Sequence, residues 1–200
     1  MAKFNFSRII PVALILIIAA VSIAALVSLA RFVFFPDSNT TTKTEVDISR
    51  DALLDTSEDR AVSLTVRGPI VANELFSSYQ IKVTPSSRDL TVYSGYLDKI
   101  SNNISLDNNV PAYEQLVYSL DKANMMKGTE LSGDKNDLRG ICASGFVYEY
   151  RVLKADSSIK SLWSSSCSGS RGSLNASMDQ LNKLFTAQIP NVKKTIEGIW

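Results

Sequence analysis

The chain has 200 residues, and its 21 lysines and arginines nearly balance its 20 aspartates and glutamates. It has two cysteines and no histidine, which excludes Ser-His-Asp and Cys-His catalysis, histidine-ligated zinc and a four-cysteine zinc site within this chain. A near-neutral chain without a basic cluster is not expected to bind nucleic acid, and we expect no cofactor and no bound metal.

An apolar segment follows the first eight residues. Residues 9–30 carry no charge, and apolar residues resume directly after Arg31 as an aromatic stretch up to residue 35. At ~1.5 Å per residue, about 22 helical residues cover the ~30 Å hydrocarbon core of a bilayer. We therefore predict that residues 1–8 are cytoplasmic and that residues 9–35 form a transmembrane signal anchor. The alternative is a signal peptide cleaved after Ala30, where small residues fit a cleavage site.

A polar segment separates the anchor from the rest of the chain. Residues 36–60 are predicted as a flexible linker, in which the stretch "ISRDALLDTSEDR" has the cap and spacing of a short helix. The folded domain is expected over residues 61–190, which is enough chain for one hydrophobic core. Residues 191–200 are expected to form a tail.

Apolar patterns within the domain predict strands and helices in a definite order. Alternating side chains predict a strand over residues 61–67 and a hairpin over residues 77–96. Helical spacing predicts a helix over residues 109–127, and a second hairpin (146–167) and a last helix (172–190) follow. We therefore predict an α+β fold, with two helices packed on one face of a single antiparallel sheet. The two hairpin–helix halves are alike, which a duplication and a common order of elements explain equally well.

The two cysteines flank the second predicted hairpin. If its turn centres near residues 154–155, Cys142 and Cys167 lie opposite each other. If the turn centres on residues 156–157, they are about four residues, or roughly 13 Å, out of step, and a bridge needs a bend that the flanking glycines permit. We predict a disulfide between them, in an oxidising compartment. The alternative is two unpaired thiols in a cytoplasmic domain.

Aromatic residues of the second hairpin are the candidate binding residues. Tyr148, Tyr150 and Trp163 are predicted to share one face with the cysteines, where they either bind a partner or pack across strands. Three Ser-x-x-Lys matches, a segment resembling a calcium loop (134–140) and a Ser/Gly-rich segment all lack the companion residues of a catalytic, calcium or phosphate site. We therefore predict no catalytic residue and no enzymatic activity.

Three segments carry a family resemblance: residues 65–96, 113–128 and 139–150. Together they resemble uncharacterised, N-terminally anchored envelope proteins of candidate-phylum bacteria. The resemblance covers nearly all of the predicted domain and implies neither an activity nor a site. The order of hairpins and helices also resembles β-lactamase-inhibitor-type α+β modules, a likeness of fold that does not carry function.

These features predict a single-pass membrane protein whose C-terminal domain lies outside the cytoplasm. The expected partners are the lipid bilayer, through residues 9–35, and an unknown envelope protein or cell-surface ligand. The expected role is a binding or structural module. One alternative is an inhibitor-like module acting on an envelope enzyme, which an exposed aromatic cluster would favour. The other is an enzyme of unrecognised type, which a deep pocket joining a lysine or two carboxylates would favour.

Overall fold

The structure is a computed structural model that describes residue 22, residues 48–170 and residues 172–199. The predicted cytoplasmic segment (1–8) and, apart from Ser22, the predicted anchor (9–35) lie outside the described residues. No helix within the described part of the chain is long and apolar enough to cross a membrane.

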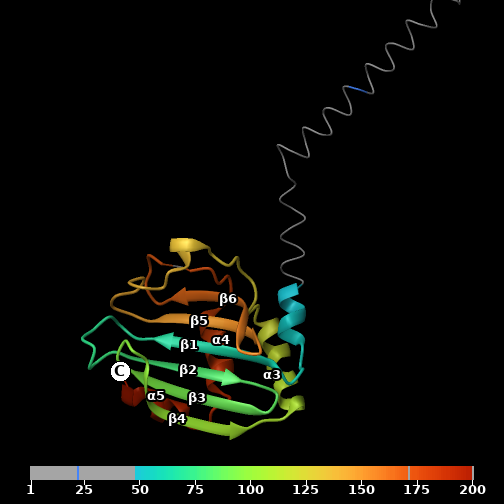
Figure 1. The fold of residues 1–200 in the computed structure, drawn as a ribbon, viewed down its shortest axis with the longest axis horizontal. Helices are drawn as coiled ribbons and strands as arrows, with labels where there is room; N and C mark the ends of the chain where they lie inside the picture. Colours follow the sequence, from blue (N-terminus) through green and yellow to red (C-terminus); the bar gives the residue numbers. More distant parts are fainter. Residues whose placement is uncertain (1–21, 23–47, 171, 200) are drawn as a thin grey trace, which may run out of the picture. The chain divides into compact units, whose positions relative to one another are not determined.

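Six strands form one antiparallel sheet in the order β4-β3-β2-β1-β5-β6 (Figure 1). The strands are β1 (Arg60–Arg67), β2 (Ser77–Val83), β3 (Ser87–Ser94), β4 (Lys99–Asp107), β5 (Val147–Lys154) and β6 (Ser157–Ser165). The predicted α+β class with a single antiparallel sheet is therefore confirmed. The first strand, β1, lies in the middle of the sheet because it pairs with both β2 and β5.

Helices cover one face of this sheet (Figure 1). They are α3 (Val110–Lys122), α4 (Met178–Thr186) and the short α5 (Val192–Ile196). The described chain also has two 3-10 turns, η1 (Gly133–Asn136) and η2 (Glu197–Ile199). The strand residues beneath them alternate, as the period of a strand requires. In the register, Leu64 of β1 lies between Ile81 and Tyr150, and all three are fully buried in the core. We call the opposite side, which faces away from α3 and α4, the open face.

The strand β4 is absent from the predicted order. The chain after β3 does not pass directly into a helix but returns along β3, so β2, β3 and β4 form a three-stranded meander. Residues 99–107 are mostly polar, and only Ile104 and Leu106 pack partly against the core. A strand at the edge of a sheet needs little apolar surface, and this one therefore gives a weak sequence signal. The two halves of the domain differ by this strand.

The last long helix begins later than predicted. It starts at Met178, where the Ser177 side chain accepts a hydrogen bond from the Gln180 amide, and not near residue 172. The preceding segment instead follows the outer side of β6, because the amides of Ser173 and Leu174 both donate to the Trp163 carbonyl oxygen, at 3.0 and 2.9 Å. Backbone hydrogen bonding to a strand edge thus competes successfully with helix extension.

The packed unit extends beyond the predicted limits at both ends. Residues 48–54 are helical, and Leu53 lies in the core with 1% of its surface exposed. Arg50 of this helix forms a bidentate ion pair with Asp121 of α3, with two N–O distances of 2.9 Å. Near the C-terminus, Val192 is also buried in the core. Residues 36–47 of the predicted linker lie outside the described residues. Residues 48–54 are not a free linker, because Leu53, the partly buried Ala52 and Leu54 and the Arg50–Asp121 ion pair hold them to the core.

Candidate functional site

The disulfide organises one end of the sheet. The sulfur atoms of Cys142 and Cys167 lie 2.02 Å apart, so the predicted pair is bonded in the structure. The hairpin turn lies at residues 155–156, between the two turn positions considered from the sequence. Continued beyond the strands, the register would place Cys142 opposite Ser170, and the loops outside the strands therefore bend to bring the two cysteines together.

A small second core surrounds the disulfide on the open face. It contains Cys142, Val147 and Trp163, all buried, and apolar side chains from Leu131, Leu138 and Ile141 pack against them. Gly145 permits this packing, because a Cβ atom at that position would lie 2.9 Å from the Cys142 sulfur and 2.3 Å from the Ser166 hydroxyl oxygen. The disulfide and this small core hold the segment 137–143 against the sheet.

The predicted aromatic surface is wrong, because Tyr150 and Trp163 are buried and Trp163 lies on the opposite face of the sheet from the two tyrosines. Tyr150 is fully buried on the helix-covered face, where it packs on Phe185 and donates a 2.7 Å hydrogen bond to the Asn182 side chain. Tyr148 lies half-buried on that same face. Trp163 pairs with Glu149 across the strands and therefore lies buried on the open face. The cross-strand packing alternative describes these side chains better.

A hollow of about 330 Å³ lies beside the small core, beyond the ends of β1 and β5. Its apolar lining comes from Ile70, Phe76, Tyr96, Leu138, Ile141, Cys142 and Val147, and its charged lining comes from Arg67, Asp98, Asp137 and Arg139. Three loops meet here: residues 68–76, 94–98 and 137–143. We call these three loops the loop end. A volume of this size and a mainly apolar lining are typical of small binding sites.

Backbone and aromatic contacts join the loops of this end. The Tyr96 hydroxyl donates a 2.7 Å hydrogen bond to the Val71 carbonyl and accepts a 3.1 Å bond from the Val71 amide. The Tyr96 ring stacks on Phe76, with ring centroids 4.1 Å apart. The Ile70 amide donates to the Ala143 carbonyl oxygen at 2.9 Å, which links the first loop to the disulfide segment. These contacts therefore connect the three loops that line the hollow.

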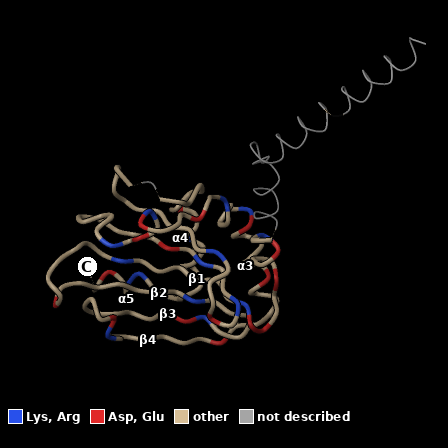
Figure 2. The backbone as a smooth tube through the Cα atoms, turned by 45° about the horizontal axis from the view of Figure 1, so that its top comes forward, with Lys and Arg blue, Asp and Glu red and all other residues tan. Residues whose placement is uncertain are grey.

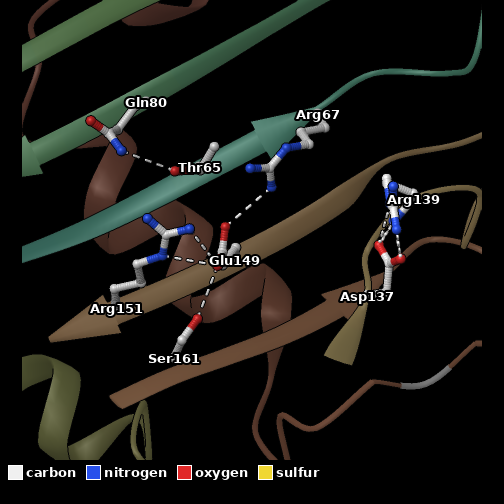
Figure 3. Close-up of polar contacts among 8 residues, drawn as sticks. All are labelled: Thr65, Arg67, Gln80, Asp137, Arg139, Glu149, Arg151 and Ser161. Atoms are coloured by element: carbon white, nitrogen blue, oxygen red, sulfur yellow. Dashed lines mark hydrogen bonds and ion pairs between the residues drawn. The ribbon is translucent and has the colours of Figure 1, made fainter. Parts of the chain in front are cut away.

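The buried carboxylate of Glu149, on the open face, positions the Arg67 guanidinium of the hollow (Figure 3). Glu149 accepts hydrogen bonds from Arg67 at 3.1 Å, from Arg151 at 2.6 and 2.9 Å and from the Ser161 hydroxyl at 3.0 Å. Burial alone would raise the pKa of Glu149, but the charges of Arg151 and Arg67 and their hydrogen bonds lower it below its ordinary value. The ionised Glu149 thus holds Arg67 at the mouth of the hollow.

A second ion pair lies on the disulfide segment (Figure 3). The Arg139 guanidinium and backbone amide donate hydrogen bonds to Asp137, with both Nε contacts at 2.9 Å. These bonds and the positive charge lower the pKa of Asp137 to about 2. Asp137 is therefore an anion at neutral pH and cannot act there as a proton donor.

The charged groups of the hollow bear on the enzyme alternative. The hollow does join two carboxylates, Asp98 and Asp137, which is the arrangement that the enzyme alternative requires. However, Asp137 is held ionised by Arg139 and so cannot serve as the acid of an acid–base pair. No group of three metal-ligating side chains occurs within the described residues. Apolar walls with paired charges at the rim are typical of a surface that receives another molecule.

Exposed apolar side chains extend the site over the surrounding loops. Leu97 is 92% exposed and Leu75 is 71% exposed. The other large exposed apolar residues at this end are Ile70, Val71 and Tyr96 in the loops and Ile100 at the adjoining start of β4. The described chain has nine such residues, so six of the nine gather here. Figure 2 shows, by contrast, that basic and acidic residues are intermixed along the described backbone.

The loop end was missed from the sequence, although a signal for it was present. The segment "GPIVANELF" and the turn "SGYLDKI" combine turn residues with large apolar side chains. Apolar residues in short turns between strands have no obvious core position, and they therefore indicate an exposed apolar surface.

Comparison of the sequence with models of known protein families and with curated proteins finds no match. The function must therefore be inferred from the geometry of the loop end.

Proposed function

We propose that this chain is a binding module, held in a membrane by residues 9–35 with its folded unit outside the cytoplasm, and that its loop end receives a partner protein of the cell envelope. The observation that carries the proposal is the concentration of exposed apolar side chains around the hollow. Monomeric proteins rarely expose contiguous apolar surface without a binding role.

A protein partner fits the composition of this surface. The hollow provides an apolar recess for one side chain of a partner, and Leu75 and Leu97 flank it with further apolar area. At the rim, Arg67 and Arg139 offer hydrogen-bond donors that are already positioned by carboxylates. An apolar centre with a polar rim, in which arginine and tyrosine are enriched, is the usual anatomy of a protein–protein interface.

The disulfide supports the location outside the cytoplasm. Disulfides persist in oxidising compartments and are rare in the cytosol. The Cys142–Cys167 bond lies directly behind the hollow, so oxidation shapes the wall of the site. The inhibitor-like alternative depended on an exposed Tyr/Trp cluster, and the burial of Tyr150 and Trp163 removes the observation that favoured it.

Site-specific photocrosslinking in the full-length chain tests the binding proposal. A photoreactive residue at Leu97 is expected to form one major adduct in native membranes, and the same residue at Tyr118 on α3 is the control. Leu75→Glu should reduce the Leu97 adduct at least tenfold, since a charge would have to be buried in an apolar contact. Identical adducts at both positions, no adduct at Leu97, or an adduct containing only a second copy of the chain would contradict the proposal.

The location is tested separately. Protease added to whole cells should digest the folded unit without cell rupture. Protection in whole cells followed by digestion after rupture would place the unit in the cytoplasm, whatever the crosslinks show.

A further inference from the structure

The two edges of the sheet are treated differently. Along β6, the segment after the second cysteine covers the outer edge: Trp163 accepts backbone hydrogen bonds from Ser173 and Leu174, and its own amide donates to the Ser173 hydroxyl. Along β4, no other described strand pairs with the outer edge. An unpaired edge presents a row of amide and carbonyl groups that another strand can use.

The outer edge of β4 has few of the features that block strand addition, and only the Asp107 carbonyl oxygen, at its end, already accepts hydrogen bonds from the Arg88 guanidinium, at 2.8 and 3.1 Å. The strand has nine residues, contains no proline, and carries charges only at its ends, Lys99 and Asp107. Seven of its nine positions are exposed. A register irregularity opposite Val92 and Tyr93 lies near its start, so residues 102–107 form the regular part that an added strand would meet.

The two sides of this regular part differ in chemistry. On the helix-covered face, Ile104 and Leu106 are half-buried and pack against the edge of the core. On the open face lie Asn103, Ser105 and Asp107. A matching strand must therefore present apolar side chains on one face and hydrogen-bonding side chains on the other.

We propose that a second copy of this chain supplies that strand, by antiparallel pairing of β4 with β4 about a twofold axis at Ser105. In this register, Ile104 lies opposite Leu106 of the second copy, and Asn103 lies opposite Asp107 of the second copy. Both relations occur twice by symmetry. Apolar residues thus meet apolar residues, and each carboxylate meets an amide that can donate a hydrogen bond to it.

Neighbouring registers that keep the two faces aligned are less complementary. With the axis at Ile104, Asn102 lies opposite Leu106. With the axis at Leu106, Asp107 lies opposite Ser105 and Ile104 lies opposite Asn108. Only the Ser105 register pairs both half-buried apolar residues with each other, and the chemistry of the strand therefore selects it.

The pairing is short, and the dimer should be weak in dilute solution. Five residues per strand, from 103 to 107, bury far less than the ~1,200 Å² of a standard stable interface. Confinement of the chain to a membrane, which rests on the function proposed above, would raise its effective concentration and favour pairing. The pairing itself needs no membrane, so its test does not depend on that function.

Cysteine crosslinking of the full-length chain in detergent tests the pairing directly. The native cysteines are both in a disulfide, so Ser105→Cys introduces the single free thiol. Strands in antiparallel pairs hold opposite Cα atoms ~4.5–5.5 Å apart, within the range that a disulfide bridges. Mild oxidation should yield a covalent dimer with Ser105→Cys and at least tenfold less with Ser158→Cys, at an exposed position near the start of β6.

A charge exchange tests the register. Adding Asn103→Asp to Ser105→Cys opposes two carboxylates and should lower the dimer yield at least threefold, while the oxygen that accepts from Thr91 is retained. Further addition of Asp107→Asn should restore the yield. Such a recovery would show that Asn103→Asp acts by charge repulsion across the paired strands and not by unfolding the chain. Equal yields from Ser105→Cys and Ser158→Cys would overturn the dimer, and a yield insensitive to Asn103→Asp would overturn the register.

Discussion

At the scale of single residues, Glu149 joins the sheet to the charges of the loop end. It is 6% exposed and binds two guanidinium groups and a hydroxyl. Glu149→Gln keeps the shape of the side chain but leaves Arg67 and Arg151 without their carboxylate. We expect the free energy of unfolding at pH 7 to fall by about 1–3 kcal/mol, measured by urea denaturation.

The same variant should alter the pH dependence of stability. Because the pKa of Glu149 is lower in the folded chain than its ordinary value of 4.5, ionised Glu149 stabilises the fold above that pH. This stabilisation is lost as the pH falls through the folded-state pKa. The difference between the native chain and Glu149→Gln should therefore shrink below about pH 4. An equal difference at pH 3 and pH 7 would contradict this origin, and exposed Glu58→Gln is the control.

The residue scale also shows what sequence reasoning can and cannot assign. The cysteine pair was predictable, because two thiols around a hairpin have few alternatives. The aromatic site was not, because the side of a strand depends on register. The register irregularity between Val152 and Leu153 changes which residues of β6 share a face with Tyr150, and it places Trp163 on the other face. The local composition does not predict this irregularity.

At the scale of elements, the helix over residues 48–54 decides where the folded unit begins. Its sequence is polar except for a few side chains, and one of them, Leu53, is fully enclosed by the core. Leu53→Ala should lower the free energy of unfolding by about 2–5 kcal/mol, as other buried leucines do. The exposed Ile48→Ala, in the same helix, should change it by less than about 0.5 kcal/mol. Equal small effects in thermal and urea denaturation would show that this segment is a linker after all.

The disulfide loop is the second element with a measurable share of stability. The bond joins residues 25 positions apart, and closing a loop of that length stabilises a fold by about 3 kcal/mol through the denatured state. The double variant Cys142→Ser/Cys167→Ser should lose about that much stability in urea denaturation. Reductant should destabilise the native chain by a similar amount and leave the double variant unchanged. A response of the double variant to reductant would point to another cause.

Elements with strong apolar periodicity were the predictable ones. Helix α3 begins at its predicted cap, with the Asn109 side chain bound to its first turn and Tyr113, Leu116, Val117 and Leu120 buried, but it ends at Lys122 and not at residue 127. Strand β4 and the segment before α4 were not predictable, because backbone pairing with a neighbouring strand determines both of them. Such pairing depends on tertiary structure and leaves little mark in the composition of a segment.

At the scale of the whole molecule, the sheet order explains why two hairpins form one core. The strand β1 pairs with β2 on one side and β5 on the other, so residues from both ends of the domain meet across it. The alternation of apolar and polar side chains predicted most of the strands. The central place of β1, however, depends on pairing between strands far apart in the sequence, which the order of the elements does not reveal. It also brings the loops after β1 and β3 and before β5 to the same end, which creates the proposed site.

Three tyrosines buried in this single core predict how the whole molecule responds to alkali. Burial raises the pKa of Tyr79 to about 12 and raises the pKa of Tyr113 and Tyr150 further above the ordinary value of 10.0. Below pH 10 each phenol is neutral in both the folded and the unfolded chain, so its contribution to stability is constant. Above pH 10 the unfolded chain loses these protons first, and stability falls by about 1.4 kcal/mol per pH unit for each tyrosine.

Tyr150→Phe should separate this effect from ordinary packing. At pH 8 the variant loses the hydrogen bond to Asn182, which should cost about 1 kcal/mol. Between pH 10 and 11.5 its stability should fall less steeply than that of the native chain, since one ionising group is absent, and the two curves should converge. Urea denaturation across that range measures both slopes, with Tyr118→Phe, on the exposed side of α3, as the matched control. Parallel curves would mean that Tyr150 is accessible to hydroxide in the folded state, and that the core under α4 opens before the molecule unfolds.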